Sequence, residues 1–314
     1  MTAHRARLGG FVACVVDSDP RFGLEAVRWY ASASRLAGIP GDALVVNMIG
    51  DDNSRLAAYL RSQHVTVQSI ERFDARSPHC NKIAGALRVD LMGHGGPLVL
   101  TDTDVAMFAD PRSVAVPPDT IGMRPVDEAN PPIEVLREIF AAADLPEPDV
   151  GPTGWIRDAY TLAGNGNGGL YVIPAEVKAP LTRAWARWAS WLLARRHLLS
   201  AWTIHVDQVA MALALQHEGI KVIDLGPSWN VPTHAVAIPQ DLPRPEMVHY
   251  HGAVRWNGSI AMTQSPEVDA VIAAANRATA EVLKEAGGLT KLRLLATARR
   301  LRNSLQDRGR RWVR

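Results

Sequence analysis

The sequence predicts an α/β fold in which helices flank a mixed, mostly parallel β-sheet. Apolar, strand-like runs alternate with helical segments of roughly 10 to 15 residues from Phe11 to Asp104, which is the pattern of consecutive βαβ units. The strands are nearly continuous apolar runs, as expected for strands covered on both faces. Acidic residues follow two of them directly, at the end where open α/β sheets bind ligands.

The elements follow one another without long gaps. "GGFVACVV" is a buried strand that ends in an acidic loop at Asp17, and "FGLEAVRWYASASRLAG" has the spacing of an amphipathic helix that closes at Gly38. Four segments continue the alternation: the strand "DALVVNMIG", the helix "SRLAAYLRSQ", the strand "VTVQSIE" and the helix "HCNKIAGALRVDLMG". "GPLVLTDTD" is the fourth strand.

The middle of the chain is less regular. "VAVPPDTIGMRPVDEANPPIEV" and "DLPEPDVGPTGW" are rich in proline, which predicts loops over a site. A long helical region follows, with Trp185, Trp188 and Trp191 at three-residue spacing. We interpret this tryptophan stripe as core packing, with a sugar platform as the alternative.

Length and composition indicate one large domain plus an appendage. The chain has 314 residues, of which 47% are apolar, and nearly balanced charge. Its two cysteines, Cys14 and Cys80, have neither a disulfide nor a zinc spacing, which predicts a reducing compartment. "FVACVV" is too short for a signal sequence or a membrane span, so we expect a soluble, cytoplasmic protein.

The C-terminal tail differs from the rest of the chain. Residues 289–314 contain nine basic residues and one acidic residue, so the body is net acidic and is not expected to bind nucleic acid. Leu294, Ala298, Leu301 and Leu305 form an apolar stripe flanked by arginines. This profile predicts peripheral contact with an anionic membrane at its inner face, and the alternative is that the stripe packs on the body. We divide the chain into a main domain, 1–265, and a helical, basic extension, 266–314.

The strand "GPLVLTDTD" ends with two carboxylates, Asp102 and Asp104. Residues i and i+2 of a strand point to the same side, so both carboxylates are expected to face one small volume. Two like charges at that spacing favour a hard divalent cation with oxygen ligands. The alternative is an acidic β-turn in which one of them caps the next segment.

Three later segments contribute polar side chains. "GNGNGGLYVIP" places Asn165 and Asn167 before an apolar strand, and the alternative for this segment is a flexible turn. "HVDQVAMALAL" puts Asp207 and Gln208 at the start of a helix, where an N-terminal cap is equally plausible. "MVHYHGAVRW" is expected to present two histidines on one strand face, with a cation three positions after the glycine; neutral imidazole joins carboxylates around ions such as Mn²⁺.

In this order the motifs resemble those of the glycogenin-like and lipooligosaccharide-galactosyltransferase family of retaining glycosyltransferases. The resemblance runs from about Phe11 to Trp256 and rests on five short motifs in sequence. It implies a GT-A fold, a Rossmann-like nucleotide-diphospho-sugar transferase fold, with the catalytic domain in residues 1–265. It also implies a Mn²⁺ or Mg²⁺ cofactor and a nucleotide-sugar donor, with a UDP-sugar expected.

The resemblance assigns the metal and diphosphate contacts. It makes Asp102 and Asp104 the Asp-x-Asp pair that holds the metal against the donor diphosphate, with His249 as the third ligand and His251 at a variable position. Arg255 stands where the family has a lysine that contacts the diphosphate. The family's following proline is replaced by Trp256.

The resemblance also assigns contacts to the sugar and the base. Asn167 would contact the donor sugar, although the small residue that follows it in the family is Gly168 here. Asp207 would hydrogen-bond the sugar, and Gln208 would lie near the anomeric carbon on the face away from the leaving group. Two further correspondences make Asp17 a nucleotide-base contact and Lys82 a cation near the donor.

The predicted function is therefore metal-dependent transfer of a hexosyl unit, with retention of configuration, to an acceptor that is a glycan, a lipid-linked glycan or a small molecule. Two alternatives stay open. Haloacid-dehalogenase-like phosphatases also end a strand in Asp-x-Asp, although their motif lies near the start of the fold and no downstream Asp-Asp metal motif follows a lysine here. A non-catalytic nucleotide-sugar or glycan-binding protein could also keep the fold.

Overall fold

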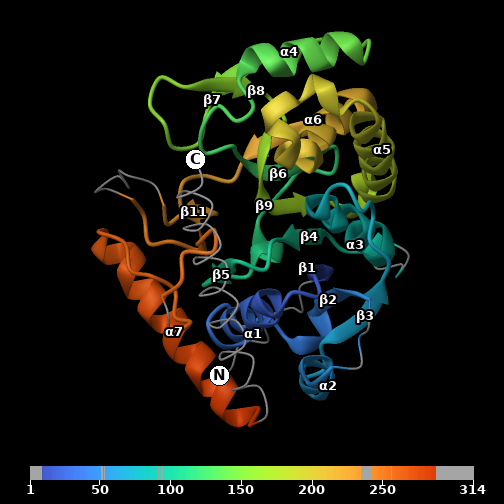
Figure 1. The fold of residues 1–314 in the computed structure, drawn as a ribbon. Coiled ribbons are helices and arrows are strands. Elements are labelled where there is room, and N and C mark those ends of the chain that lie inside the picture. The colour runs from blue at the N-terminus through green and yellow to red at the C-terminus, as the bar shows by residue number, and fades with distance from the viewer. Residues whose placement is uncertain are drawn as a thin grey trace, which may run out of the picture.

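The structure is a computed structural model that describes residues 9–287, except positions 51, 53, 91, 93, 94, 235–241 and 256. The predicted α/β architecture is confirmed: a seven-stranded mixed sheet lies at the centre and helices cover both faces (Figure 1). In spatial order its strands are β10 (Lys221–Asp224), β6 (Thr120–Pro125), β9 (Gly166–Ile173), β4 (Leu98–Thr101), β1 (Phe11–Val16), β2 (Leu44–Ile49) and β3 (Thr66–Ile70).

Strand β9 is antiparallel to both of its neighbours, whereas every other neighbouring pair in this sheet is parallel. The first residues of β9 therefore lie at the same edge of the sheet as the last residues of β4 and β6. The register places Thr101 opposite Leu170 and Pro125 opposite Gly166. This topology brings the start of one strand to the carboxyl ends of two others, the edge where open sheets bind ligands.

Two apolar layers explain why the strands are almost continuously hydrophobic. Alternate residues of β1 point to opposite faces, so that Ala13 packs in one layer and Val12 and Cys14 in the other. The first layer contains residues of α3 (Asn81–Asp90), α4 (Ile133–Ala142), α5 (Ala175–Ala194) and α6 (Val206–Glu218). The second contains residues of α1 (Pro20–Arg35), α2 (Arg55–Ser62) and the C-terminal half of α7 (Pro266–Glu285).

Two smaller sheets complete the fold. A three-stranded sheet is formed by β11 (Val231–Pro232), β12 (Met247–His249) and β5 (Val105–Met107), and β7 (Val150–Pro152) pairs with β8 (Tyr160–Leu162). Strand β12 runs antiparallel to β5, with His249 opposite Val105. The small sheet therefore joins a segment near the C-terminus to the residues that follow β4.

Two expectations about local packing are confirmed. Trp185 and Trp188 are buried and Trp191 packs partly against the same core, so the tryptophan stripe is core packing. Cys14 and Cys80 are both free and buried. In the described part of the chain, no helix combines the length and the apolar character needed to cross a membrane.

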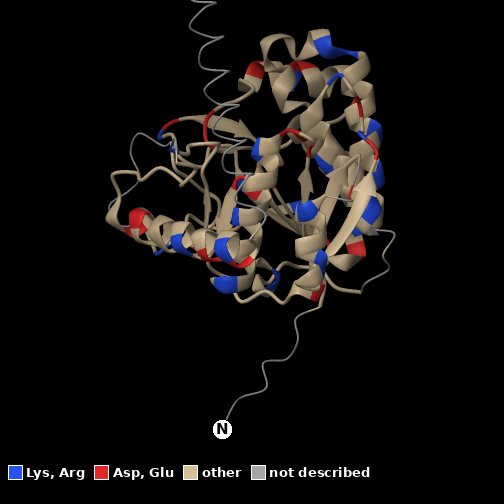
Figure 2. Cartoon of the chain, turned by 60° about the horizontal axis from the view of Figure 1, so that its bottom comes forward, with Lys and Arg blue, Asp and Glu red and all other residues tan. Residues whose placement is uncertain are grey.

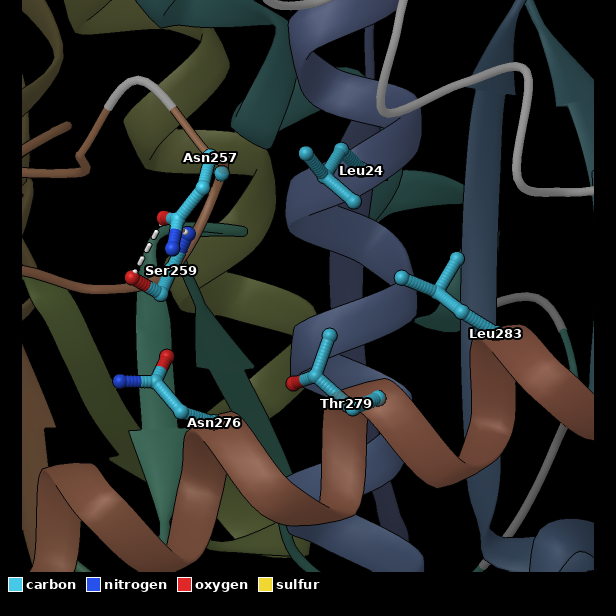
Figure 3. A pocket seen from close by; sticks show the side chains of 8 residues that line it. Leu24, Asn257, Ser259, Asn276, Thr279 and Leu283 are labelled. Carbon is cyan, nitrogen blue, oxygen red and sulfur yellow. Dashed lines mark hydrogen bonds between the residues drawn. The ribbon is translucent and has the colours of Figure 1, made fainter.

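Helix α7 packs along α1 (Figure 1). A small pocket lies between the two helices and the segment after β12 (Figure 3). Asn276 of α7 accepts a hydrogen bond from the backbone N–H of Ile260 (2.8 Å) and donates one to its carbonyl (3.1 Å). The boundary placed at residue 265 remains a prediction, and α7 itself is anchored to the body. The predicted basic tail, 289–314, lies outside the described residues.

Charged side chains are distributed over the described elements. In the view of Figure 2, Lys and Arg are interspersed with Asp and Glu along the described elements. The excess of basic residues lies in residues 289–314, and the rest of the chain is net acidic.

Candidate functional site

Asp102, Thr103 and Asp104 form the turn between β4 and β5, at the carboxyl edge of the central sheet. The sequence analysis predicted that both carboxylates project from one strand. The structure instead places them in a turn. Strand β4 ends at Thr101, where its pairing with β9 also ends, and the chain then leaves the central sheet to enter the small one. Their convergence thus comes from the turn and not from the two-residue period of a strand.

His249 reaches the same point from the small sheet. The pairing of β12 with β5 brings its Nε2 atom 3.2 Å from Asp104 Oδ1 and 3.9 Å from Asp102 Oδ2. The ring is buried, and its Nδ1 atom has no hydrogen-bond partner among the described residues. Gly169 leaves room for this ring, because a Cβ at that position would lie 2.4 Å from His249 Nδ1.

The pKa values of Asp104 and His249 are shifted in the directions that favour an ion pair between them. Burial alone would raise the pKa of Asp104, but the charge of His249 and its hydrogen bond outweigh burial and hold that pKa well below its usual range. Burial lowers the pKa of His249, yet Asp104 and Asp102 reverse the effect and raise it. The site therefore holds an ionised Asp104 carboxylate beside the imidazole of His249, whose pKa the two carboxylates raise.

These residues fit a divalent metal ion. Asp102, Asp104 and His249 each offer one ligand atom, and these atoms lie within 4.8 Å of one another. Two carboxylate oxygens and one imidazole nitrogen form a donor set that suits Mn²⁺. The predicted set of three ligands is thus brought together in space.

Lys82 lies behind the Asp-x-Asp turn at the start of α3. Its Nζ atom is 2.7 Å from Asp102 Oδ1 and 3.9 Å from Asp207 Oδ2, and it donates a hydrogen bond to the carbonyl of Gly168. Burial would lower the pKa of Lys82, but Asp102 and Asp207 outweigh it and raise that pKa. A buried, charged lysine therefore connects the predicted metal ligands to α6.

Asp207 and Gln208 lie in the first turn of α6. The cap residue is His205, so Asp207 is not the N-terminal cap, and burial raises the pKa of its carboxyl. Gln208 is half-buried, and its Oε1 atom lies 2.8 Å from His205 Nδ1. A Cβ at Gly168 would lie 2.8 Å from Lys82 Nζ, so this glycine borders the buried lysine closely.

Asn167 lies within β9, whereas the sequence analysis placed it before the strand. Its Oδ1 atom accepts from the backbone N–H of Gly169 (2.9 Å), and its Nδ2 atom donates to Asp127 Oδ2 (3.0 Å). Sequence reasoning missed Asp127, which follows β6 in "MRPVDEANPP". The available signal was an aspartate directly after an apolar strand, the same pattern that drew attention to Asp17.

Two other predicted residues form no ion pair or hydrogen bond with Asp102, Asp104 or His249 in the described part of the chain. Asp17 follows β1, and its carboxylate accepts from Arg72 (2.8 Å) and from Asn81 (3.2 Å). Arg255 is exposed, and within the described residues no ion pair or hydrogen bond joins its guanidinium to Asp102 or Asp104. Trp256 lies outside the described residues. The assignments of Asp17 to the nucleotide base and of Arg255 to the diphosphate remain predictions.

His251 does not continue the strand that carries His249. It lies in a turn with φ of 45°, and its ring stacks on that of His249 with centroids 3.6 Å apart. The two histidines therefore do not share one strand face, because β12 ends at His249. His251 instead contacts His234, which sequence reasoning also missed.

A buried carboxylate supports the turn from behind. Thr103 Oγ1 donates to Glu25 Oε2 (2.9 Å), and Glu25 lies on the buried face of α1. Burial and then the charge of Asp104 raise the pKa of Glu25 to about 7. The signal in the sequence was an acidic residue on the apolar face of an amphipathic helix.

This arrangement is that of the GT-A glycosyltransferase fold. The chain is similar to the galactosyltransferase LgtC, solved with donor and acceptor sugar analogues, with 14% sequence identity and a TM-score of 0.52, over 88% of this chain and 96% of that chain. An active-site mutant of LgtC in which glutamate replaces glutamine matches at 12% identity with a TM-score of 0.51, over 84% of this chain and 95% of that one.

The apo form of the glycosyltransferase GlyE of Streptococcus pneumoniae TIGR4 matches at 11% identity with a TM-score of 0.50, over 88% of this chain and 62% of GlyE. No protein-family model and no curated protein sequence matches the chain. Identities this low show the fold, so the function has to be argued from the site.

Proposed function

We propose that this protein is a metal-dependent glycosyltransferase that moves a hexosyl unit from a UDP-sugar to an acceptor with retention of anomeric configuration. The observation that carries the proposal is the convergence of Asp102, Asp104 and His249 at the carboxyl edge of a GT-A sheet. Asp102 and Asp104, together with His249, would hold Mn²⁺ or Mg²⁺. The bound ion supplies Lewis-acid stabilisation of the negative charge on the leaving diphosphate.

The surrounding side chains have roles that follow from their chemistry. Asn167 and Asp207 present hydrogen-bonding groups for the hydroxyls of the donor sugar. Lys82 keeps Asp102 oriented through their 2.7 Å contact, and Arg255 is the cation assigned to the diphosphate. These groups bind and orient the donor, which lowers the entropic cost of the reaction.

Gln208 is the group assigned to the far side of the anomeric carbon. A neutral amide is a poor nucleophile, which favours front-side attack by the acceptor through an oxocarbenium-like state over a covalent intermediate. The active-site mutant of LgtC replaces a glutamine by glutamate, so a glutamine lies in the active site of that enzyme. This supports the assignment of Gln208. Stabilisation of positive charge by the amide oxygen is the expected contribution of Gln208.

The test is a thermal-shift screen of nucleotide sugars with and without Mn²⁺, followed by assays of UDP release. A true donor stabilises the folded state in proportion to RT ln(1 + [L]/Kd), and we expect that stabilisation to require the metal. UDP release supports the transferase, and turnover of p-nitrophenyl phosphate would instead support the phosphatase. Donor-dependent stabilisation without either turnover would identify a binding protein and contradict the proposal.

A further inference from the structure

A second group of metal-ligating side chains lies beside the first. Asp127, His234 and His251 each offer one ligand atom, and these atoms lie within 4.8 Å of one another. They come from the segments that follow β6, β11 and β12, so the tertiary structure alone assembles them. The two groups are adjacent, because the ring of His249 in the first group stacks on the ring of His251 in the second.

The ligand atoms converge on one carboxylate oxygen. Asp127 Oδ2 lies 3.8 Å from His251 Nε2 and 4.0 Å from His234 Nε2. A Zn–N bond is about 2.0–2.1 Å long, so two ligand atoms of one ion lie roughly 3 to 4 Å apart. The observed separations therefore match those of atoms that share one ion.

Groups around the cluster already hold its ligands in place. His251 Nδ1 lies 3.1 Å from the carbonyl oxygen of His249 and 3.1 Å from His234 Nδ1, and these contacts orient both rings. Asp127 Oδ2 accepts from Asn167 Nδ2 (3.0 Å). Metal-binding histidines and carboxylates typically have such partners, which fix the tautomer and the orientation of the ligand.

The carboxylate of Asp127 also lacks a lysine or arginine partner among the described residues. Its side chain is 12% exposed, and its Oδ1 atom is buried without a hydrogen-bond partner in the described part of the chain. No lysine or arginine among the described residues forms an ion pair with it; the ionisable side chains within 4.0 Å are those of His251 and His234. A buried carboxylate in this state is stabilised by a nearby cation.

We propose that Asp127, His234 and His251 form a second metal site that takes a borderline transition ion such as Zn²⁺ or Co²⁺. Two imidazoles and one carboxylate are a softer donor set than that of the first site, which favours these ions over Mg²⁺ or Mn²⁺. His234 and His251 are 45% and 32% exposed, which leaves access for the ion and for a water ligand. The site goes beyond the proposed transferase function and requires no donor.

Binding there would join three segments that border the donor site. Asp127 is hydrogen-bonded to Asn167, and His251 stacks on His249, so both contacts reach the proposed catalytic residues. A bound ion would therefore hold these three segments in one arrangement. The expected effect is higher thermal stability and not a new chemical step.

The test is a Co²⁺ titration of the metal-free full-length protein, followed by visible absorption and by the bound metal per chain. We expect two equivalents in the wild type, and one in His234→Gln and in His251→Gln. His217→Gln is the matched control, because His217 is 41% exposed and lies 3.9 Å from Glu218 in a pair without a third ligand. This control should still bind two equivalents.

A parallel experiment uses Zn²⁺ in excess Mg²⁺ and follows the melting temperature. Zn²⁺ should raise that of the wild type and of His217→Gln but not that of His234→Gln, an exposed position whose change leaves the core intact. Equal amounts of bound metal in the wild type and in His234→Gln, or the same loss of metal in the control, would each overturn the second site. None of these results depends on a donor, so failure here is distinct from failure of the transferase proposal.

Discussion

Lys82 Nζ lies 2.7 Å from Asp102 Oδ1 and 3.9 Å from Asp207 Oδ2, and the lysine side chain is 8% exposed. This buried cation joins the Asp-x-Asp turn to the helix that carries Gln208. The proposed metal-binding and sugar-binding halves of the site therefore share one ionic contact. Its loss should affect stability as well as catalysis.

We expect Lys82→Met to lower the free energy of unfolding by about 3 kcal/mol or more at pH 7, because it leaves the buried carboxylate of Asp207 without its cation. Burial raises the pKa of Asp207, and protonation of this carboxyl reduces the penalty, so the loss should shrink as the pH falls to 4. Urea unfolding without metal measures both values. The control is Lys221→Met. The Nζ atom of Lys221 is also 2.7 Å from a carboxylate, but this pair is exposed, so its loss should lower the free energy of unfolding far less. Equal losses in the two variants would contradict this role for burial.

Asp104→Asn and His249→Ala should abolish metal-dependent transfer, because each removes a ligand atom from the three-residue group. Asp104→Asn keeps the size of the side chain but removes the charge that pairs with His249, so the metal-free protein should still fold, with a lower melting temperature. UDP release by metal-stripped protein after Mn²⁺ is restored is the measurement. Near-normal release in either variant would show that the metal is held elsewhere.

Gln208→Ala should lower kcat more than it raises KM for the donor, because a group near the anomeric carbon acts mainly on the transition state. The loss is expected to be on the order of 100-fold, the size found when one preorganised polar group is removed. Steady-state kinetics with the donor varied give both constants. NMR of the product should show retention of the donor's anomeric configuration, and inversion would exclude the proposed mechanism.

Glu25 should make stability depend on pH. Burial raises the pKa of Glu25 to about 7 in the folded state, above its ordinary value of 4.5, so the folded state binds the extra proton. Stability from this group is present below pH 4.5 and is lost as the pH rises through 7, by about 3 kcal/mol at most.

Glu25→Gln cannot ionise and keeps an oxygen acceptor for Thr103, so its stability relative to the wild type should increase between pH 5 and pH 8. Urea unfolding in EDTA at both values tests this expectation. Glu138→Gln, at an exposed position of α4, is the control and should show no such change. A constant difference between Glu25→Gln and the wild type would show that Glu25 is ionised in the folded protein throughout.

The basic tail is proposed to bind anionic membranes, where each basic residue contributes on the order of 1 kcal/mol near the surface. We expect the full chain to co-sediment with anionic vesicles at low salt, and a variant ending at Gly288 to stay in the supernatant. Neutral vesicles and high salt are the controls. Equal, salt-insensitive behaviour of the two proteins would argue that the tail serves another purpose.

The sequence by itself determined the order of strands and helices around the first four strands. Apolar runs such as "FVACVV" and the amphipathic spacing from Phe22 to Gly38 are local patterns, and local patterns survive without knowledge of the fold. It also identified Asp102, Asp104 and His249, because the Asp-x-Asp and His-Tyr-x-Gly motifs are short and contiguous. Their meeting in space, between residues 145 positions apart, was an expectation from a family resemblance.

Only the tertiary structure decided how the side chains meet. The pairing of β12 with β5 sets the position of His249, and the antiparallel insertion of β9 brings Asn167 to Asp127. The sequence misplaced His251 on the strand of His249 because the period-2 pattern continues past the last paired residue. Strand pairing and burial depend on partners distant in the chain, and no local spacing encodes which partner a strand end, a buried Glu25 or an exposed His234 will contact.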